Sequence, residues 1–153
     1  MELILWRHAD AEVGLDDLKR ELTDKGRKQA ARIAKWLKPR LEEDWKVLSS
    51  PAVRARQTAE ALERKIDIRV TLGTDASEDA LLREVGWPNA GRNVIVVGHQ
   101  PTLGRVAARL IHGKAGDISI RKGSIWWFSS RADEGVAVGE TVLRAVIGPD
   151  LSD

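Results

Sequence analysis

The sequence contains no cysteine, carries little excess charge and has no long hydrophobic run. The absence of cysteine excludes disulfides, thiolate metal ligands and a cysteine nucleophile from these 153 residues. The 25 lysine and arginine residues barely exceed the 23 aspartate and glutamate residues, and the charges are dispersed along the chain. No basic block therefore indicates a nucleic-acid partner.

The apolar runs are short. The one near the N-terminus has about five residues and no basic leader before it, so it fits neither a signal peptide nor a membrane span. We expect no membrane partner and a cytoplasmic location. The length fits a single domain over residues 1–153, with no internal repeat or low-complexity linker. Nothing in the sequence indicates an oligomeric state.

Short apolar runs alternate with amphipathic segments, which is typical of an α/β fold. Strands are predicted at residues 3–6, 45–48, 66–70 and 94–97, and helices from 24 to the break at Pro39, at 53–64, at 77–85 and from Pro101 to Ile111. The run 94–97 is the most apolar and predicts the central parallel strand. The run 66–70 alternates with charged residues and predicts a strand near an edge.

The last forty residues contain two further runs typical of strands. They lie at 124–129 and 141–147, with a turn predicted around 133–139, and together they predict a hairpin at one edge of the sheet. We therefore expect a three-layer α/β/α fold. Its sheet is expected to be mixed and mostly parallel, with a C-terminal antiparallel hairpin.

Three of the predicted strands end in polar residues. Arg7 and His8 follow the first strand, Ser50 and Arg54 follow the second, and His99 follows the strand at 94–97. Open α/β sheets bind their ligands at the carboxyl ends of strands, so we expect these side chains to converge on one crevice. Arginine binds phosphoryl oxygens in a bidentate manner, and imidazole is a nucleophile near neutral pH. The pattern predicts a phosphoryl-transfer pocket.

Three segments also resemble those of a known family. They read RHA at 7–9, SSPAVRARQT at 49–58 and VVGHQP at 96–101. In this order and spacing they resemble the histidine phosphatase superfamily, which includes the cofactor-dependent phosphoglycerate mutases. The small size and the sequence LTDKG at 22–26 resemble its phosphohistidine phosphatase branch. The resemblance implies a phosphoglycerate-mutase-like fold.

The resemblance also implies roles for four residues. His8 would be the nucleophile and form a phosphohistidine intermediate, while Arg7, Arg54 and His99 would bind the phosphoryl oxygens. No metal and no other cofactor would be required. Mutase activity is not expected, because the chain is too short for the loops that retain and reorient an intermediate. The third histidine, His112, is expected to be solvated.

A general acid is harder to assign. Asp10 lies closest to the nucleophile in sequence, and Glu78 lies where mutase-like relatives often have a proton donor. An alkoxide leaving group needs a proton, whereas imidazole, whose conjugate acid has a pKa of about 6.5, leaves with little help. A site without an acid would therefore favour phosphohistidine over a phosphate monoester.

Our leading hypothesis is a hydrolase that acts on phosphohistidine of a protein through phosphorylated His8. One alternative is a phosphomonoesterase of the same superfamily that acts on a small metabolite. Another is a non-catalytic module that binds phosphate. The expected partner is accordingly a phosphorylated protein or a small phosphorylated compound.

Two further expectations concern packing. Ala9 stands where the family more commonly has glycine, and because alanine does not readily adopt a positive φ, we expect an ordinary φ there. Trp126 and Trp127 are adjacent in a predicted strand and must point to opposite faces. Trp45 and Trp87 flank loops, where they either pack against the domain or contact a protein partner.

Overall fold

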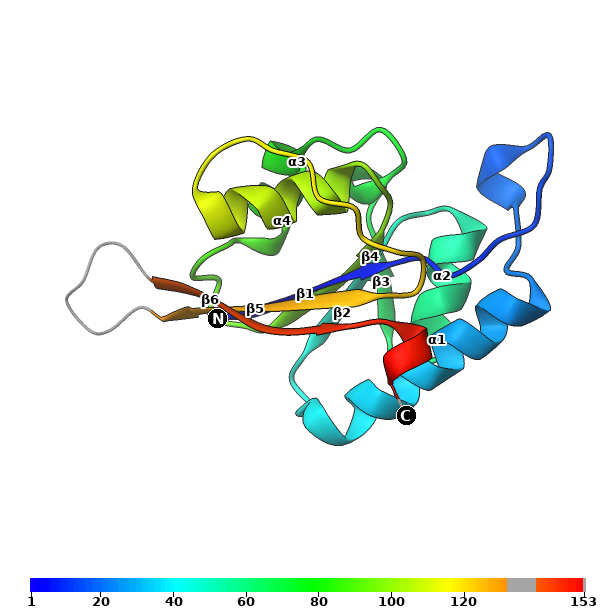
Figure 1. Cartoon of the computed structure of the whole chain (residues 1–153), viewed down its shortest axis with the longest axis horizontal. Helices are drawn as coiled ribbons and strands as arrows, with labels where there is room; N and C mark the ends of the chain where they lie inside the picture. The colour runs from blue at the N-terminus through cyan, green and yellow to red at the C-terminus, as the bar shows by residue number, and fades with distance from the viewer. Residues whose placement is uncertain (132–139, 153) are drawn as a thin grey trace.

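A six-stranded sheet forms the middle layer of the molecule (Figure 1), whose computed structural model describes residues 1–131 and 140–152. The strands are β1 (Glu2–Arg7), β2 (Lys46–Ser49), β3 (Ile66–Ile68), β4 (Val94–Gly98), β5 (Ile125–Arg131) and β6 (Glu140–Ile147). Their order across the sheet is β3-β2-β4-β1-β5-β6. The first four strands are parallel, and β5 and β6 form the antiparallel pair beside β1. The mixed, mostly parallel sheet is thus confirmed, while the turn predicted at 133–139 lies outside the described residues.

Helices cover both faces of the sheet. Figure 1 shows α1 (Asp24–Leu37) and α2 (Val53–Glu60) on one side and α3 (Glu78–Val85) and α4 (Thr102–His112) on the other. Short 3-10 turns are present at η1 (Asp17–Lys19), η2 (Lys38–Arg40), η3 (Val70–Leu72) and η4 (Pro149–Leu151). The three-layer prediction is therefore confirmed. Within the described part of the chain, no helix combines the length and the apolar character needed to cross a bilayer.

Helix boundaries follow local capping chemistry. The Thr23 hydroxyl accepts a hydrogen bond from the backbone N–H of Gly26 at 2.9 Å, which starts α1 at the predicted residue. Gly86 ends α3 in the left-handed conformation with φ of 72°. The prediction for α2 was too long, because the helix ends at Glu60 and the chain then turns through Glu63 with φ of 57°.

Successive residues of the strands point to opposite faces of the sheet and pack in two hydrophobic cores. Ile4 and Trp6 of β1 face α1 and α2, whereas Leu3 and Leu5 face α3 and α4. Every residue of β4 is buried, which confirms it as the central parallel strand. Strand β3 is an edge strand, as its alternating pattern predicts, and Ile68 there is 43% exposed. The predicted strand was too long, because β3 ends at Ile68 and Val70 begins η3.

The tryptophans pack on both faces of the hairpin. Trp127 makes edge-on contacts with Trp36 and Trp45, whose ring centroids lie 6.2 and 5.6 Å away. Trp126 packs against the opposite core, which confirms that the two neighbours point to opposite faces. Trp45 is 5% exposed, and Trp87 packs against the core beneath α3 and α4. Both of these residues therefore have a packing role.

Candidate active site

The ends of β1, β4 and β2 meet at one edge because the strands are in register there. Arg7 pairs with Gly98, and Ser49 pairs with Val97. The ladder continues past the strand ends, where the His8 N–H donates to the Gly98 carbonyl at 3.0 Å and the Ser50 N–H donates to the Val97 carbonyl at 3.1 Å. Three polar strand ends that are far apart in sequence are thus held at the same level of the sheet.

His8 and His99 face each other at this edge. Their ring centroids are 5.2 Å apart with the planes tilted by 55°. Both residues are buried, with 7% and 4% of their surfaces exposed. The prediction that these two side chains lie in one crevice agrees with this geometry.

Arg54 enters the crevice from the first turn of α2 and is 4% exposed. Thr58, one turn later, links this helix to the segment that follows β1. Its hydroxyl donates to the Arg54 carbonyl at 2.8 Å and accepts from the backbone N–H of Ala9 at 3.0 Å. The position of Arg54 is therefore tied to the residue that follows His8.

Arg7 is held by the segment that leads into β5. Its Nη1 donates to the Ile120 carbonyl at 2.8 Å, and the Gly123 N–H donates to the carbonyls of Arg7 and His8 at 3.0 and 3.1 Å. This segment was not predicted to be part of the site. Its contacts are made by backbone groups, which every residue has, so no pattern of side chains could have predicted them.

Three side-chain nitrogens at this edge are buried without a hydrogen-bond partner in the chain. They are Nε of Arg7, Nε of Arg54 and Nδ1 of His99, and they are the full set of buried side-chain nitrogens and oxygens without a partner among the described residues. Buried polar groups are normally paired, because leaving one unpaired costs about 1–3 kcal/mol. Three buried nitrogens without partners at one edge of the sheet are therefore suited to bind an anion with several oxygens.

The hydrogen bonds of the two histidines assign their tautomers. His8 Nδ1 lies 2.8 Å from the Ala9 carbonyl, which can only accept, so Nδ1 carries the proton and Nε2 has a free lone pair. His99 Nε2 lies 2.8 Å from the Ser50 hydroxyl, which already accepts from the Ala52 N–H at 3.1 Å. We assign Ser50 as donor to Nε2, which makes His99 Nδ1 an N–H donor.

Both imidazoles are held neutral. Burial, and then the positive charges of Arg54 and Arg7, lowers the pKa of His8 from 6.5 to about 4. Burial, and then the neighbouring His8 and Arg54, lowers the pKa of His99 to about 3. Near neutral pH the pair thus combines an unprotonated Nε2 with an N–H donor between two guanidinium groups.

Asp17 contacts Arg54, a pairing that sequence analysis did not find. Arg54 Nη1 donates to the Asp17 carbonyl at 2.7 Å, and Nη2 lies 3.2 Å from the Asp17 carboxylate. Arg20 also donates to this carboxylate at 3.0 Å. Hydrogen bonds from Arg20 and then Arg54 lower the pKa of Asp17, so it is ionised. The acidic pair at positions 16 and 17 was visible in the sequence, but its partner was not.

Other side chains engage both candidate acids. The Asp10 carboxylate accepts from Thr23 Oγ1 at 2.8 Å and from Lys122 Nζ at 3.1 Å, and these two hydrogen bonds lower its pKa. Glu78 begins α3, and its carboxylate lies 3.8 Å from Arg109 Nη1 of α4. The geometry does not favour Asp10 as an acid, and Glu78 is engaged by a cation.

Ala9 has an ordinary backbone conformation. Among the described non-glycine residues, Glu63 has a positive φ and Ala9 does not, which confirms the expectation. Ala9 is fully buried, and its carbonyl accepts the hydrogen bond from His8 Nδ1. Alanine therefore occupies this position without backbone strain. His112 is exposed at the end of α4, as expected.

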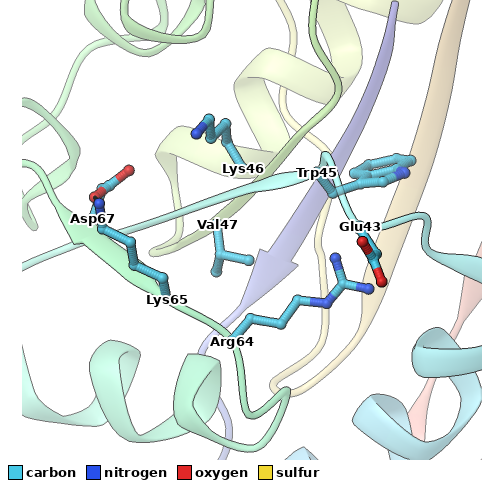
Figure 2. Close-up of a pocket in the computed structure, with 7 residues that line it drawn as sticks. All are labelled: Glu43, Trp45, Lys46, Val47, Arg64, Lys65 and Asp67. Atoms are coloured by element: carbon cyan, nitrogen blue, oxygen red, sulfur yellow. Dashed lines mark ion pairs between the residues drawn. The ribbon is translucent and has the colours of Figure 1, made fainter.

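A second hollow lies at the other end of the parallel strands (Figure 2). It is lined by residues that begin or precede β2 and β3, namely Glu43, Trp45, Lys46, Val47, Arg64, Lys65 and Asp67. Arg64 is occupied by the backbone carbonyls of Leu41 and Glu42. None of the four predicted site residues lines this hollow, so the candidate site is at the carboxyl edge.

Comparison with known proteins agrees with this geometry. Residues 3–89 match the family model described as the histidine phosphatase superfamily (branch 1). An uncharacterized protein of Picosynechococcus sp. is 33% identical over 139 residues, which cover 82% of each chain.

Two solved structures share the fold over nearly the whole chain. The protein histidine phosphatase SixA complexed with tungstate is 25% identical, with a TM-score of 0.81 and 98% coverage of both chains. A proposed phosphohistidine phosphatase SixA from Nakamurella multipartitia is 28% identical, with a TM-score of 0.78 and coverage of 97% of this chain and 95% of its own. The chain therefore belongs to branch 1 of the histidine phosphatase superfamily, resembles its phosphohistidine phosphatases, and is a phosphatase.

Proposed function

We propose that this protein hydrolyses phosphohistidine on other proteins, with His8 as the nucleophile and Arg7, Arg54 and His99 as the phosphoryl-binding residues. The observation that carries the proposal is the set of three buried N–H donors without partners, which belong to three of these four residues. A phosphoryl group supplies three oxygens and negative charge, which match the three donors and the positive charge of the two guanidinium groups to which two of these donors belong.

The hydrogen bond of His8 supports a two-step reaction. Nε2 attacks phosphorus, the bond from phosphorus to the leaving nitrogen breaks, and that nitrogen keeps the electron pair. The other ring nitrogen of the substrate phosphohistidine carries a proton, so the leaving group departs as neutral imidazole. The Ala9 carbonyl retains the proton on Nδ1, so phosphorylated His8 is an imidazolium. Water then attacks phosphorus, the bond to Nε2 breaks, and phosphate and neutral His8 are released. The positive charges of Arg7 and Arg54 stabilise the phosphoryl oxygens in both steps.

The contacts of the candidate acids support phosphohistidine as the substrate. Among the described residues, Asp10 and Asp17 are each held ionised by two donors, and Glu78 lies beside Arg109. An imidazole leaving group does not require a strong acid, because its conjugate acid has a pKa of about 6.5. Serine and sugar phosphates would leave as alkoxides, which do require one.

A labelling experiment tests the nucleophile. The protein is mixed with radiolabelled phosphoramidate and quenched in base, and we expect an acid-labile label that is lost in His8→Ala. The matched control is His112→Ala, which removes an exposed histidine remote from the crevice and should keep the label. Undiminished label in His8→Ala would refute the role of His8.

A comparison of leaving groups tests the substrate. A phosphohistidine peptide, several sugar phosphates and an aryl phosphate are compared by kcat/KM. We expect the phosphohistidine peptide to be preferred. A preference for a sugar phosphate by orders of magnitude would favour the small-molecule phosphomonoesterase and would leave the His8 label intact. No label and no hydrolysis would favour a non-catalytic phosphate-binding module.

A further inference from the structure

A groove adjoins the candidate active site. It is lined by Leu18 of η1, by η3, by the segment that leads to α3, and by Ser50 and Pro51, which follow β2. Ser50 also binds His99 Nε2, so the groove and the crevice share a residue. A polypeptide that places a phosphorylated side chain on His8 would therefore pass along this groove.

The sides of the groove carry exposed aliphatic side chains. Val70 is 87% exposed and Leu18 is 52% exposed, and Val13 and Leu15 of the same loop as Leu18 are fully exposed. Figure 1 shows this loop, with η1, standing out beside α2 from the body of the molecule. Of these residues, Leu18 and Val70 line the groove together, and exposed aliphatic side chains beside a site favour the binding of an apolar group there.

These side chains are held in place by buried contacts behind them. Leu72, two residues after Val70, is 2% exposed and packs in the core beneath α3 and α4. Asp17, the neighbour of Leu18, bonds to Arg54 through both its carbonyl and its carboxylate. The loop is therefore attached directly to a phosphoryl-binding residue, and the groove surface is continuous with the catalytic crevice.

We propose that the groove between Leu18 and Val70 binds the polypeptide segment that flanks the phosphohistidine, through an apolar side chain close to it. This inference rests on the proposed function and names its substrate as a protein segment rather than a small metabolite. A sugar phosphate has no apolar group to bury against Leu18 or Val70, so these residues would contribute nothing to its binding. A leucine or valine next to phosphohistidine would gain affinity there.

The test measures kcat/KM of the wild type and of groove variants on different substrates. Two short phosphohistidine peptides are compared, one with leucines on both sides of the phosphohistidine and one with serines. Phosphoramidate serves as the substrate without a polypeptide. The variants are Leu18→Ser and Val70→Ser, and the control is Leu151→Ser, an aliphatic residue of η4 that is 77% exposed and does not line the groove.

Each groove variant is expected to lower kcat/KM for the leucine peptide by about fivefold to tenfold, the effect of one aliphatic contact. The serine peptide, phosphoramidate and Leu151→Ser should show no change. Equal hydrolysis of the two peptides by the wild type, or an equal loss with phosphoramidate, would overturn the docking proposal while the proposed function stands. Hydrolysis of monoesters but of no phosphohistidine would instead refute the proposed function, and the docking proposal with it.

Discussion

Asp17→Asn tests whether the loop beside α2 orients Arg54. The substitution keeps the size of the side chain and removes its charge. The bond from Arg54 Nη1 to the Asp17 carbonyl remains, whereas the carboxylate 3.2 Å from Nη2 becomes a neutral amide. A hydrogen bond to a charged group contributes about 1.5–3 kcal/mol when it is buried. Because the Asp17 side chain is 55% exposed, we expect only about 1 kcal/mol after solvent screening.

This energy should appear mainly in kcat. A loss of about 1 kcal/mol in the transition state lowers the rate about fivefold. Substrate binding changes less, because the variant also removes a negative charge that repels the phosphoryl group, and the two effects on KM oppose each other. The assay is steady-state hydrolysis of a phosphohistidine peptide, with kcat and KM measured separately.

The neighbouring Asp16 provides a matched control. Asp16→Asn removes the same charge from the same loop, its side chain is 59% exposed, and it pairs with Lys19 at 3.6 Å. We expect it to leave kcat unchanged. Asp17→Asn should also have no further effect in the Arg54→Ala background. An equal fall in kcat for both aspartate variants, or no fall for Asp17→Asn, would refute the argument that Asp17 orients Arg54.

Two further predictions concern stability. Because the pKa of folded His8 is about 4 against 6.5 when exposed, the unfolded chain binds more protons between these values. His8 should therefore lower the free energy of unfolding of the protein by about 2 kcal/mol from about pH 7 to about pH 5, in addition to the fall that His99, with a pKa of about 3, contributes over the same range. In urea titrations the fall should be smaller in His8→Asn than in the wild type by about this amount, and equal falls would contradict this. A Cβ at Gly26 would lie 1.9 Å from the Asp10 carbonyl oxygen, so Gly26→Ala should lower stability by about 3 kcal/mol. Gly14→Ala, whose Cβ approaches nothing closer than 3.5 Å, should be neutral in the same titrations, and similar urea midpoints for the two glycine variants would contradict the clash.

Sequence patterns predicted the strands and helices because their signals are local. The apolar run of β4, the Thr23 cap of α1 and the exposed alternation of β3 each depend on side chains within a few positions of one another. The location of the site at one edge of the sheet could also be predicted, because parallel strands have their carboxyl ends at the same edge. The end of α2 was not predicted, because the chain turns through the positive φ of Glu63 and no side-chain pattern indicates this backbone conformation.

The sequence alone determined the strand ends that carry Arg7, His8 and His99, because a buried strand followed by a polar residue is a local sequence pattern. Only the tertiary structure decided how those groups are held. Asp17 meets Arg54 across 37 positions, and Arg7 meets the Ile120 carbonyl across 113. Such contacts depend on the reach and direction of side chains after the layers have packed, and on backbone carbonyls that every residue possesses. Residue identity therefore predicted which groups gather at the sheet edge, and packing decided their protonation, orientation and partners.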